Sequence, residues 1–323
     1  MVTELSSPCL DRERPVQKQL VSSKTGCAAA IVAFKPDAEL IVALARAVAR
    51  EAMPVIVFAN SPIEPGVAQR LGACGAELIV ASANVGLGEA FNQCADAARA
   101  RGAKRLLLLD QDSEAPDGLV AALKEAMDRL TLRGDVPGVI GPRIVAPPGV
   151  VFRAPRYFPK VGARPLGAAR PVEYVISSGS LIDLDTLSRV GPFRADFFID
   201  AIDTEWCFRA WSRGASCWVL SDVELRHRIG EGIVRNLGRA IPRQAKFRLY
   251  AYVRNQSHCL TLAHVPLAWK ALIAAHVLRV VLVSWVDQRF SLHFLGAMFQ
   301  AAQRGLRGKL GPPPGAELEP QLS

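Results

Sequence analysis

Residues 105–113 read Arg-Leu-Leu-Leu-Leu-Asp-Gln-Asp-Ser, a short apolar run that stops on two carboxylates, Asp110 and Asp112. A run this short and this apolar is typical of a strand buried on both faces of a parallel sheet. In an extended chain, residues i and i+2 point the same way, so the two aspartates can converge just past the strand's carboxyl end. Open α/β sheets bind ligands at that edge. The pattern predicts either a polar turn or a site for a hard divalent cation, Mg²⁺ or Mn²⁺, that holds a phosphate.

Apolar runs alternate with helical periods on both sides of this segment. We expect strands at 27–34, 54–60 and 77–81, each followed by a helix, at 37–51, 65–74 and 87–100. The run at 106–109 is then a fourth strand, followed by a helix at 117–130 and by strands at 138–144, 172–181 and 215–220. This order predicts an α/β fold with a parallel, doubly wound sheet. The basic, proline-rich segment 146–171 is expected to be either a lid or a solvated loop.

The composition is that of a globular protein with a large core, since 50% of the 323 residues are hydrophobic. The seven cysteines include no C-x-x-C pair, which favours reduced thiols in a cytoplasmic protein. Residues 1–25 are predicted to be a disordered leader without a signal peptide. The net charge of +9 suits a phosphorylated substrate or an anionic membrane surface, and no aromatic-basic motif favours nucleic acid.

Two common nucleotide-binding motifs are missing from the sequence. Gly86-Leu87-Gly88 has Phe91 where a dinucleotide fingerprint needs a third glycine, and no Gly-Lys-Ser/Thr P-loop occurs. A Rossmann dehydrogenase and a P-loop kinase are therefore disfavoured. A metal bridged by carboxylates remains as the way to hold a diphosphate.

A second acidic segment follows at 197–209. If Asp200 is the N-cap of a helix, Asp203 shares one face of that helix with Trp206 and Cys207. A carboxylate placed there can act as a general base, or it can merely complement the helix dipole. Glu205 lies four residues before an arginine and is expected to form a surface ion pair with it.

The order of these motifs resembles the family 2 glycosyltransferases of the GT-A fold, and specifically the bacterial rhamnosyltransferases that use dTDP-L-rhamnose. The resemblance runs from about residue 31 to about residue 308. It is carried by Asn-Val-Gly-Leu-Gly at 84–88 with Asn92, Leu-Leu-Leu-Asp-Gln-Asp-Ser at 107–113, Ser-Ser-Gly-Ser-Leu-Ile at 177–182, Phe-Ile-Asp-Ala-Ile-Asp-Thr-Glu-Trp-Cys at 198–207, His-Arg-Ile-Gly at 227–230 and Tyr-Val-Arg-Asn at 252–255.

The resemblance implies a Rossmann-like, mostly parallel sheet flanked by helices in a catalytic domain at 26–235. The helical periodicity that follows predicts an extension at 236–310, and the composition predicts a disordered tail at 311–323. It implies an inverting transfer in which Asp203 removes the proton of the acceptor hydroxyl. Asp110 and Asp112 would hold the metal, and His227 would lie beside it as a ligand. From the residues alone, His227 is either a metal ligand or a solvated loop histidine.

The resemblance also implies which residues surround the substrates. The residues expected at the nucleotide-sugar donor are Phe34, Asn60, Asn84, Gly86 and Gln111. Those expected at the saccharide or lipid-linked acceptor are Ser178, Gly179, Glu205 and Trp206.

The sequence also departs from the family pattern. Relatives commonly carry Tyr-Asn after the first strand and Asp-Asn after the second, whereas this chain has Phe34-Lys35 and Ala59-Asn60. The acid that contacts the nucleobase is thus replaced by Ala59, which leaves another nucleotide sugar open as the donor. Two further alternatives are a haloacid-dehalogenase-like phosphotransferase with Asp110 as the nucleophile, and a non-catalytic sugar-nucleotide-binding membrane module.

The last third of the chain has helical periodicity at 240–262 and 267–306. Its apolar run at 271–286 contains His276 and Arg279 and is predicted to be too short to span a membrane, which takes about 20 apolar residues. Aromatic residues beside arginines, such as Phe290 and Phe299, suit a helix in an anionic membrane interface. Packing on the catalytic domain or on a second subunit of a homodimer is the alternative. The expected location is cytoplasmic, peripheral to the inner face of the cell membrane.

Overall fold

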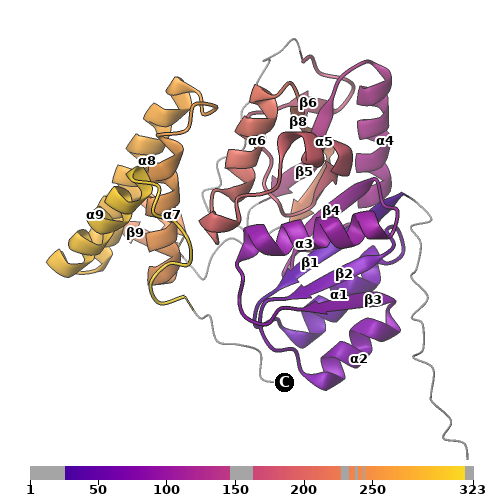
Figure 1. The fold of residues 1–323 in the computed structure, drawn as a ribbon, viewed down its shortest axis with the longest axis horizontal. Coiled ribbons are helices and arrows are strands. Elements are labelled where there is room, and N and C mark those ends of the chain that lie inside the picture. Colours follow the sequence, from indigo (N-terminus) through magenta and orange to yellow (C-terminus); the bar gives the residue numbers. More distant parts are fainter. Residues whose placement is uncertain (1–25, 146–162, 227–232, 237–238, 243, 317–323) are drawn as a thin grey trace, which may run out of the picture.

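The computed structural model describes residues 26–145, 163–226, 233–236, 239–242 and 244–316. Within this part of the chain, eight strands form one sheet with the order β3-β2-β1-β4-β7-β5-β8-β6 (Figure 1). The strands are β1 (Cys27–Ala33), β2 (Val55–Ala59), β3 (Ala76–Val80), β4 (Arg105–Asp110), β5 (Pro137–Val145), β6 (Ala169–Pro171), β7 (Ser180–Asp183) and β8 (Ser216–Arg226). The expected α/β sheet is therefore present.

The first four strands are parallel, as the alternation of runs and helices predicts. Strand β1 pairs with both β2 and β4, and Val32 lies opposite Asp110 in the β1–β4 register. Each of the four leucines of β4 is at most 1% exposed, and burying such a side chain contributes about 1.5–3 kcal/mol. This burial fixes the position where β4 ends, and with it the position of Asp110.

The second half of the sheet differs from the expectation. Strand β7 covers only Ser180–Asp183 and runs antiparallel between β4 and β5. The β-branched run at 172–176, predicted to be part of a strand, instead crosses the sheet irregularly. Val172 N donates to Cys217 O (2.9 Å), and Trp211 Nε1 donates to Val172 O (3.0 Å). These tertiary hydrogen bonds override the local strand preference.

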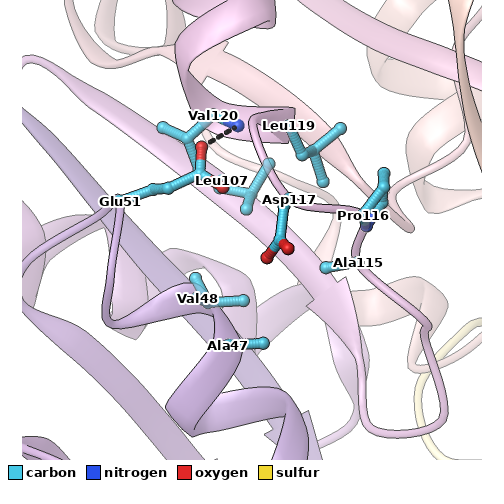
Figure 2. A pocket seen from close by; sticks show the side chains of 9 residues that line it. All are labelled: Ala47, Val48, Glu51, Leu107, Ala115, Pro116, Asp117, Leu119 and Val120. Atoms are coloured by element: carbon cyan, nitrogen blue, oxygen red, sulfur yellow. Dashed lines mark hydrogen bonds between the residues drawn. The ribbon is translucent and has the colours of Figure 1, made fainter.

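Helices flank the sheet (Figure 1): α1 (Ala38–Val48), α2 (Pro65–Ala73), α3 (Leu87–Ala100), α4 (Leu119–Leu132), α5 (Leu184–Val190), the short 3₁₀ helix η2 (Ala195–Phe197) and α6 (Ile202–Ser212). Helix α4 begins after Gly118, and a distant residue caps it. The carboxylate of Glu51 accepts hydrogen bonds from the backbone N–H groups of Gly118 (2.6 Å), Val120 (3.0 Å) and Ala121 (3.2 Å). Figure 2 shows Glu51 at this helix start, beside a small pocket that Leu107 and Asp117 help to line.

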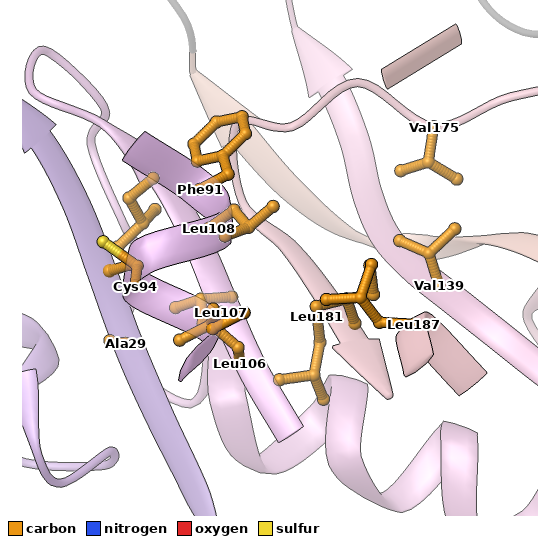
Figure 3. Packing of buried hydrophobic residues seen from close by; sticks show 14 of the residues in the cluster. Ala29, Phe91, Cys94, Leu106, Leu107, Leu108, Val139, Val175, Leu181 and Leu187 are labelled. Carbon is orange, nitrogen blue, oxygen red and sulfur yellow. The ribbon is translucent and has the colours of Figure 1, made fainter. Parts of the chain in front are cut away.

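The main core lies between the sheet and its helices. Phe91 and Cys94 of α3 pack with the leucines of β4, and Leu181 of β7 continues the same cluster (Figure 3). The thiol of Cys94 is fully buried, and desolvation raises its pKa well above the ordinary value. The described cysteines are free thiols.

The last part of the chain forms a group of helices beside the α/β unit (Figure 1): α7 (Lys246–Cys259), α8 (Leu267–Asp287) and α9 (Leu292–Leu306), preceded by the hairpin β9 (Ile233–Asn236) and β10 (Arg239–Pro242). Two expectations are wrong here. A hairpin occupies residues where a helix was expected to begin, and the predicted helix 267–306 is broken at Arg289 and Phe290, which have left-handed φ values of 51° and 60°. Helix α8 has 21 residues, so by length and composition it can cross a membrane, contrary to the prediction that it is too short.

Candidate active site

The turn after β4 comprises residues 110–113 and is tied to the end of β1. Ser113 N donates to Asp110 O (3.1 Å), which closes a β-turn. The side chain of Gln111 makes two bonds to Phe34, because its Oε1 accepts from Phe34 N (2.7 Å) and its Nε2 donates to Phe34 O (3.1 Å). Asp110 and Asp112 lie on either side of Gln111, and both are partly exposed. The two aspartates are thus presented by a turn, and not by the extended chain that the i, i+2 spacing suggested.

A second turn, at 177–180, connects this β4 turn to helix α6. Gly179 N donates to Leu108 O (2.8 Å), and the hydroxyls of Ser113 and Ser178 are hydrogen bonded at 2.7 Å. Ser177 N donates to Asp203 Oδ2 (3.1 Å). One short segment therefore joins the two acidic sites that the sequence places about 90 residues apart.

Ser178 and Gly179, expected at the acceptor, are both buried. Gly179 has a left-handed φ of 77°, and a Cβ at this position would lie 2.9 Å from Leu225 Cδ2. This position therefore requires glycine for both its backbone angle and its packing. The structure gives both residues a structural role behind the β4 turn.

Asp203 lies in the first turn of α6 with both carboxylate oxygens engaged by the backbone. Oδ2 accepts from Ser177 N, and Oδ1 accepts from Thr204 N (2.7 Å). Desolvation by burial raises the pKa of Asp203, the backbone hydrogen bonds oppose that rise, and the negative charges of Asp110 and Asp200 add to it. Burial is the largest cause of the raised pKa, and the two neighbouring carboxylates are smaller ones. A carboxyl with this environment suits a general base.

The segment before α6 has an unusual backbone. Phe198, Asp200 and Ala201 have φ values of 65°, 64° and 64°, in the left-handed region that residues other than glycine seldom adopt. Ala201, and not Asp200, is the residue preceding the first turn of α6, so the expectation that Asp200 is the N-cap is wrong. Asp200 instead pairs with Arg248 of α7 at 3.1 Å. Strain of this kind needs surrounding contacts that hold it.

Helix α7 supplies those contacts. The side-chain amide of Asn255 donates from Nδ2 to three carbonyl oxygens of this loop, those of Phe197 (2.9 Å), Ile199 (2.7 Å) and Asp200 (3.1 Å). Arg254 Nη2 also donates to Phe197 O (3.0 Å). Asn255 and Arg254 are fully buried. Two polar side chains inside the α7 group therefore hold the loop that leads into Asp203.

Arg248 was not predicted as a site residue. The charge of Asp200 raises its pKa against the lowering effect of burial, and the charges of Asp110 and Asp112 add to that rise. The guanidinium of Arg248 thus lies close enough to Asp200, Asp110 and Asp112 to interact with their negative charges. The sequence signal that could have found it is a basic residue seven positions before Asn255, two turns away on the same face of one helix.

Glu205 and Trp206, expected at the acceptor, are buried at 1% exposure each. Arg209 Nη2 lies 3.0 Å from Glu205 Oε2, and His264 Nε2 lies 2.9 Å from Glu205 Oε1. Burial alone would raise the pKa of Glu205, but the adjacent imidazole of His264 and the guanidinium of Arg209 bring it below its ordinary value. Trp206 Nε1 donates to Gly191 O (3.0 Å). The expected surface ion pair is therefore a buried one, and the structure gives both side chains a packing role.

The residues expected at the donor shape the loop before α3. Asn60 donates from Nδ2 to Gly86 O (3.2 Å) and accepts at Oδ1 from Val85 N (3.1 Å). Asn84 Oδ1 accepts from Gly86 N (3.0 Å). A Cβ on Gly86 would lie 2.6 Å from Phe198 O. This glycine thus lets the α3 loop press against the loop before Asp203.

The carboxylate side chains of the β4 turn are of the type that binds a hard cation. Within the described ranges, no group of three or more His, Cys, Asp or Glu side chains could hold a metal. Asp110 and Asp112 are two partly exposed carboxylates of one turn. Mg²⁺ is commonly bound through one or two carboxylates together with substrate phosphates. Asp110 and Asp112 are therefore the residues that could hold such an ion. His227, the third expected ligand, lies outside the described residues.

Comparison with known proteins gives one curated relative and several structures. No protein-family model matches the chain. It is 25% identical over 245 residues to the dTDP-rhamnosyl transferase RfbF of Shigella flexneri, which covers 72% of this chain and 79% of that protein. The structure of TarS 1–349 from S. aureus in complex with UDP-GlcNAc superposes with a TM-score of 0.56 at 14% identity, over 87% of this chain and 80% of that one.

The structure of GalNAc-T7 with UDP, GalNAc and Mn²⁺ superposes with a TM-score of 0.55 at 13% identity. It covers 80% of this chain, which spans only 55% of the GalNAc-T7 chain. These superpositions confirm the GT-A fold that the motifs predicted. They oppose the haloacid-dehalogenase alternative, and the similarity to RfbF confirms the resemblance to rhamnosyltransferases.

Proposed function

We propose that this chain, a glycosyltransferase of the GT-A fold similar to the family 2 rhamnosyltransferases, transfers L-rhamnose from dTDP-L-rhamnose with inversion at the anomeric carbon. The observation that carries the proposal is the joining of Asp203 to the β4 turn through residues 177–180. This connection supports a base that acts on the acceptor hydroxyl beside a turn that binds the diphosphate of the donor. The similarity to RfbF supports the choice of donor.

In the proposed reaction, the acceptor hydroxyl oxygen forms a bond to the anomeric carbon while the bond from that carbon to the diphosphate oxygen breaks. The hydroxyl proton goes to the carboxylate of Asp203, whose raised pKa favours accepting it. A divalent cation held by Asp110 and Asp112 would supply positive charge beside the departing diphosphate. Arg248, which stays protonated, adds a fixed positive charge near the same carboxylates.

We propose further that the donor lies along the carboxyl ends of β1, β2 and β4, where Phe34 and Gln111 join two strand ends and Asn60, Asn84 and Gly86 shape the adjacent loop. The acceptor is proposed to be a cell-surface polysaccharide or a lipid-linked saccharide, met on the cytoplasmic side. Because Ala59 offers no polar side chain to the nucleobase, we expect backbone groups of this edge to make the contacts to thymine.

The test is a nucleotide-release assay with dTDP-L-rhamnose, UDP-sugars and GDP-sugars, each with and without EDTA. We expect release of dTDP from dTDP-L-rhamnose that EDTA suppresses and that a saccharide acceptor accelerates. Turnover of a UDP- or GDP-sugar alone would replace the proposed donor. Donor binding without turnover on any acceptor would favour the non-catalytic module.

Metal use can be tested without turnover. Because Asp110 and Asp112 supply only part of a coordination shell, we expect electron paramagnetic resonance to detect tight Mn²⁺ binding only when dTDP is also present. Asp112→Asn should abolish the coupling between Mn²⁺ and dTDP, whereas Asp117→Asn, an exposed aspartate beyond the turn, should leave it unchanged. Equal Mn²⁺ binding with and without dTDP would contradict this arrangement.

A further inference from the structure

The pair of helices α8 and α9 exposes apolar side chains that no described residue covers. Leu278 and Leu282 of α8, Phe290 in the turn, and Leu292 and Phe299 of α9 are all exposed; we call these five residues the apolar tip. Leu292 and Phe299 are 79% and 72% exposed and are seven residues apart, so they lie on one face of α9. A large exposed apolar surface marks a site of interaction.

Helix α8 is more apolar than its burial requires. It is apolar along most of its 21 residues, yet its buried residues are only Trp269, Ile273, Val280, Val283 and Ser284. Its buried side chains are on one side, where Val280 and Val283 belong to the cluster shared with α7 and α9. A helix that packs one face on protein and leaves further apolar residues outside needs another apolar phase beside it.

The charge around the apolar tip identifies the kind of partner. Residues 267–310 contain six basic residues and one acid, Asp287, so this segment carries +5 of the chain's net charge of +9. Arg279 and Arg289 are exposed and follow or precede the exposed Leu278 and Phe290 directly in the sequence, and Arg307 is exposed at the end of α9. Two copies of this chain meeting at these tips would bring two such positive segments together. An anionic lipid surface complements both the charge and the apolar side chains.

The contacts of α8 argue against a position that crosses a membrane. Trp269, near its start, packs against the rings of Tyr174 (5.6 Å) and Phe208 (5.3 Å) of the α/β unit. Arg279 lies in the middle of the helix. A spanning position would break the ring contacts and bury this arginine in lipid, which is costly.

We propose that the apolar tip and its surrounding arginines form a docking surface for an anionic membrane, with Leu292 and Phe299 entering the interface. The bilayer contact is made by helices α8 and α9, while α7 holds the loop before Asp203. The surface is independent of the proposed reaction, so its test uses no donor or acceptor.

The experiment is vesicle flotation of the full chain with phosphatidylglycerol-containing vesicles and with pure phosphatidylcholine vesicles. We expect binding to the anionic vesicles only, and its loss at about 0.5 M salt because charge contributes to it. The double substitution Leu292→Gln with Phe299→Gln should lower the partition coefficient about tenfold or more. The control is Leu132→Gln, since Leu132 is 87% exposed at the end of α4 and away from the tip; it should bind as the unsubstituted chain does.

A second pair of substitutions tests the charge without touching an apolar residue. Arg289→Gln with Arg307→Gln should lower binding by about fivefold for each arginine removed. Circular dichroism confirms that each variant is folded before flotation. Failure of the unsubstituted chain to float with anionic vesicles, or unchanged flotation of the Leu292/Phe299 variant, would overturn the proposal. A dimer in sedimentation velocity that this variant converts to a monomer, without vesicle binding, would instead assign the surface to a second copy.

Discussion

Two aspartate-bearing turns meet at the candidate active site, and they are built differently. The β4 turn at 110–113 follows a strand of four buried leucines and is closed by its own hydrogen bond and by Gln111. The loop at 197–201 has three left-handed residues that are not glycine, and Asn255 holds it from another part of the chain. The first turn has its own closing hydrogen bond in addition to tertiary bonds to Phe34 and Ser178, whereas the left-handed backbone of the second is held by side chains of α7. Substitutions should therefore affect the two turns differently.

The largest expected effect separates the proposed chemical roles of the two turns. Asp203→Asn should lower the transfer rate by about 10²–10⁴-fold because the base is lost, while donor binding, assigned to the β4 turn, persists. Transfer kinetics and calorimetric titration with donor measure the two quantities. Asp96→Asn, on the exposed side of α3, is the control and should change neither.

The pH dependence of the transfer rate is a second test of Asp203 as the base. Only the ionised carboxylate accepts a proton, and burial raises the pKa of Asp203 above the ordinary value of 3.8. The transfer rate should therefore fall as the pH drops through this raised pKa, at a higher pH than for an ordinary aspartate. Loss of donor binding equal to the loss of transfer in Asp203→Asn would show that the residue is structural.

The next largest effect is expected from a substitution in α7 that removes only the hydrogen bonds to the loop at 197–201. Asn255→Asp keeps the shape of the side chain but removes the N–H groups that reach three carbonyls of the loop. Unpartnered buried polar groups cost about 1–3 kcal/mol each, so we expect the free energy of unfolding to fall by about 3 kcal/mol. Denaturant unfolding measures it.

Activity should also decline in Asn255→Asp, through kcat more than through donor KM, because the loop orients Asp203 and not the β4 turn. Gln256→Glu makes the same amide-to-acid change one position along α7, at a partly exposed side chain, and should cost little. If the two variants are equally stable and active, Asn255 does not hold the loop.

The contrast between the turns also explains what the sequence could predict. The leucine run and the acids that follow it are local signals, and the apolar face that Asp203 shares with Trp206 and Cys207 is a local period, so both were found. The loop at 197–201 carries no glycine or asparagine at its left-handed positions, and such residues are the usual signal for that backbone. Its conformation depends on Asn255, more than 50 residues later in the chain.

The burial of the Glu205–Arg209 ion pair also could not be predicted from the sequence. An acid and an arginine four residues apart usually form an exposed pair, yet Glu205 and Arg209 are covered because His264, from the turn before α8, closes over them. The family pattern assigned roles to Asn60 and Asn84, whereas the hydrogen bonds of these side chains to the loop before α3 became visible only in the structure.

A smaller effect tests how closely the α3 loop presses on the second turn. In Gly86→Ala, the new Cβ would lie 2.6 Å from Phe198 O at a φ of 80°. We expect a loss of about 2–3 kcal/mol in the free energy of unfolding, together with reduced transfer, because Phe198 must shift. Gly102→Ala separates the two causes, since Gly102 has a similar φ of 76° and its Cβ would meet no described atom within 4 Å. It should cost only about 1 kcal/mol and leave transfer unchanged; equal losses would mean that the contact with Phe198 is unimportant.

The smallest effect concerns the chain that leaves the β4 turn. Glu51 accepts three backbone N–H bonds at the start of α4 (Figure 2), so Glu51→Gln removes the negative charge from a helix N-terminus and replaces one accepting oxygen with an N–H donor. Such caps contribute about 0.5–2 kcal/mol, so we expect the free energy of unfolding to fall by about this amount. The melting temperature should fall accordingly, with transfer unchanged. Glu125→Gln removes the same charge from an exposed position of α4 and should leave the melting temperature almost unchanged. A fall in transfer by Glu51→Gln would show that the β4 turn, too, depends on a distant residue, and the distinction between the two turns would be one of degree.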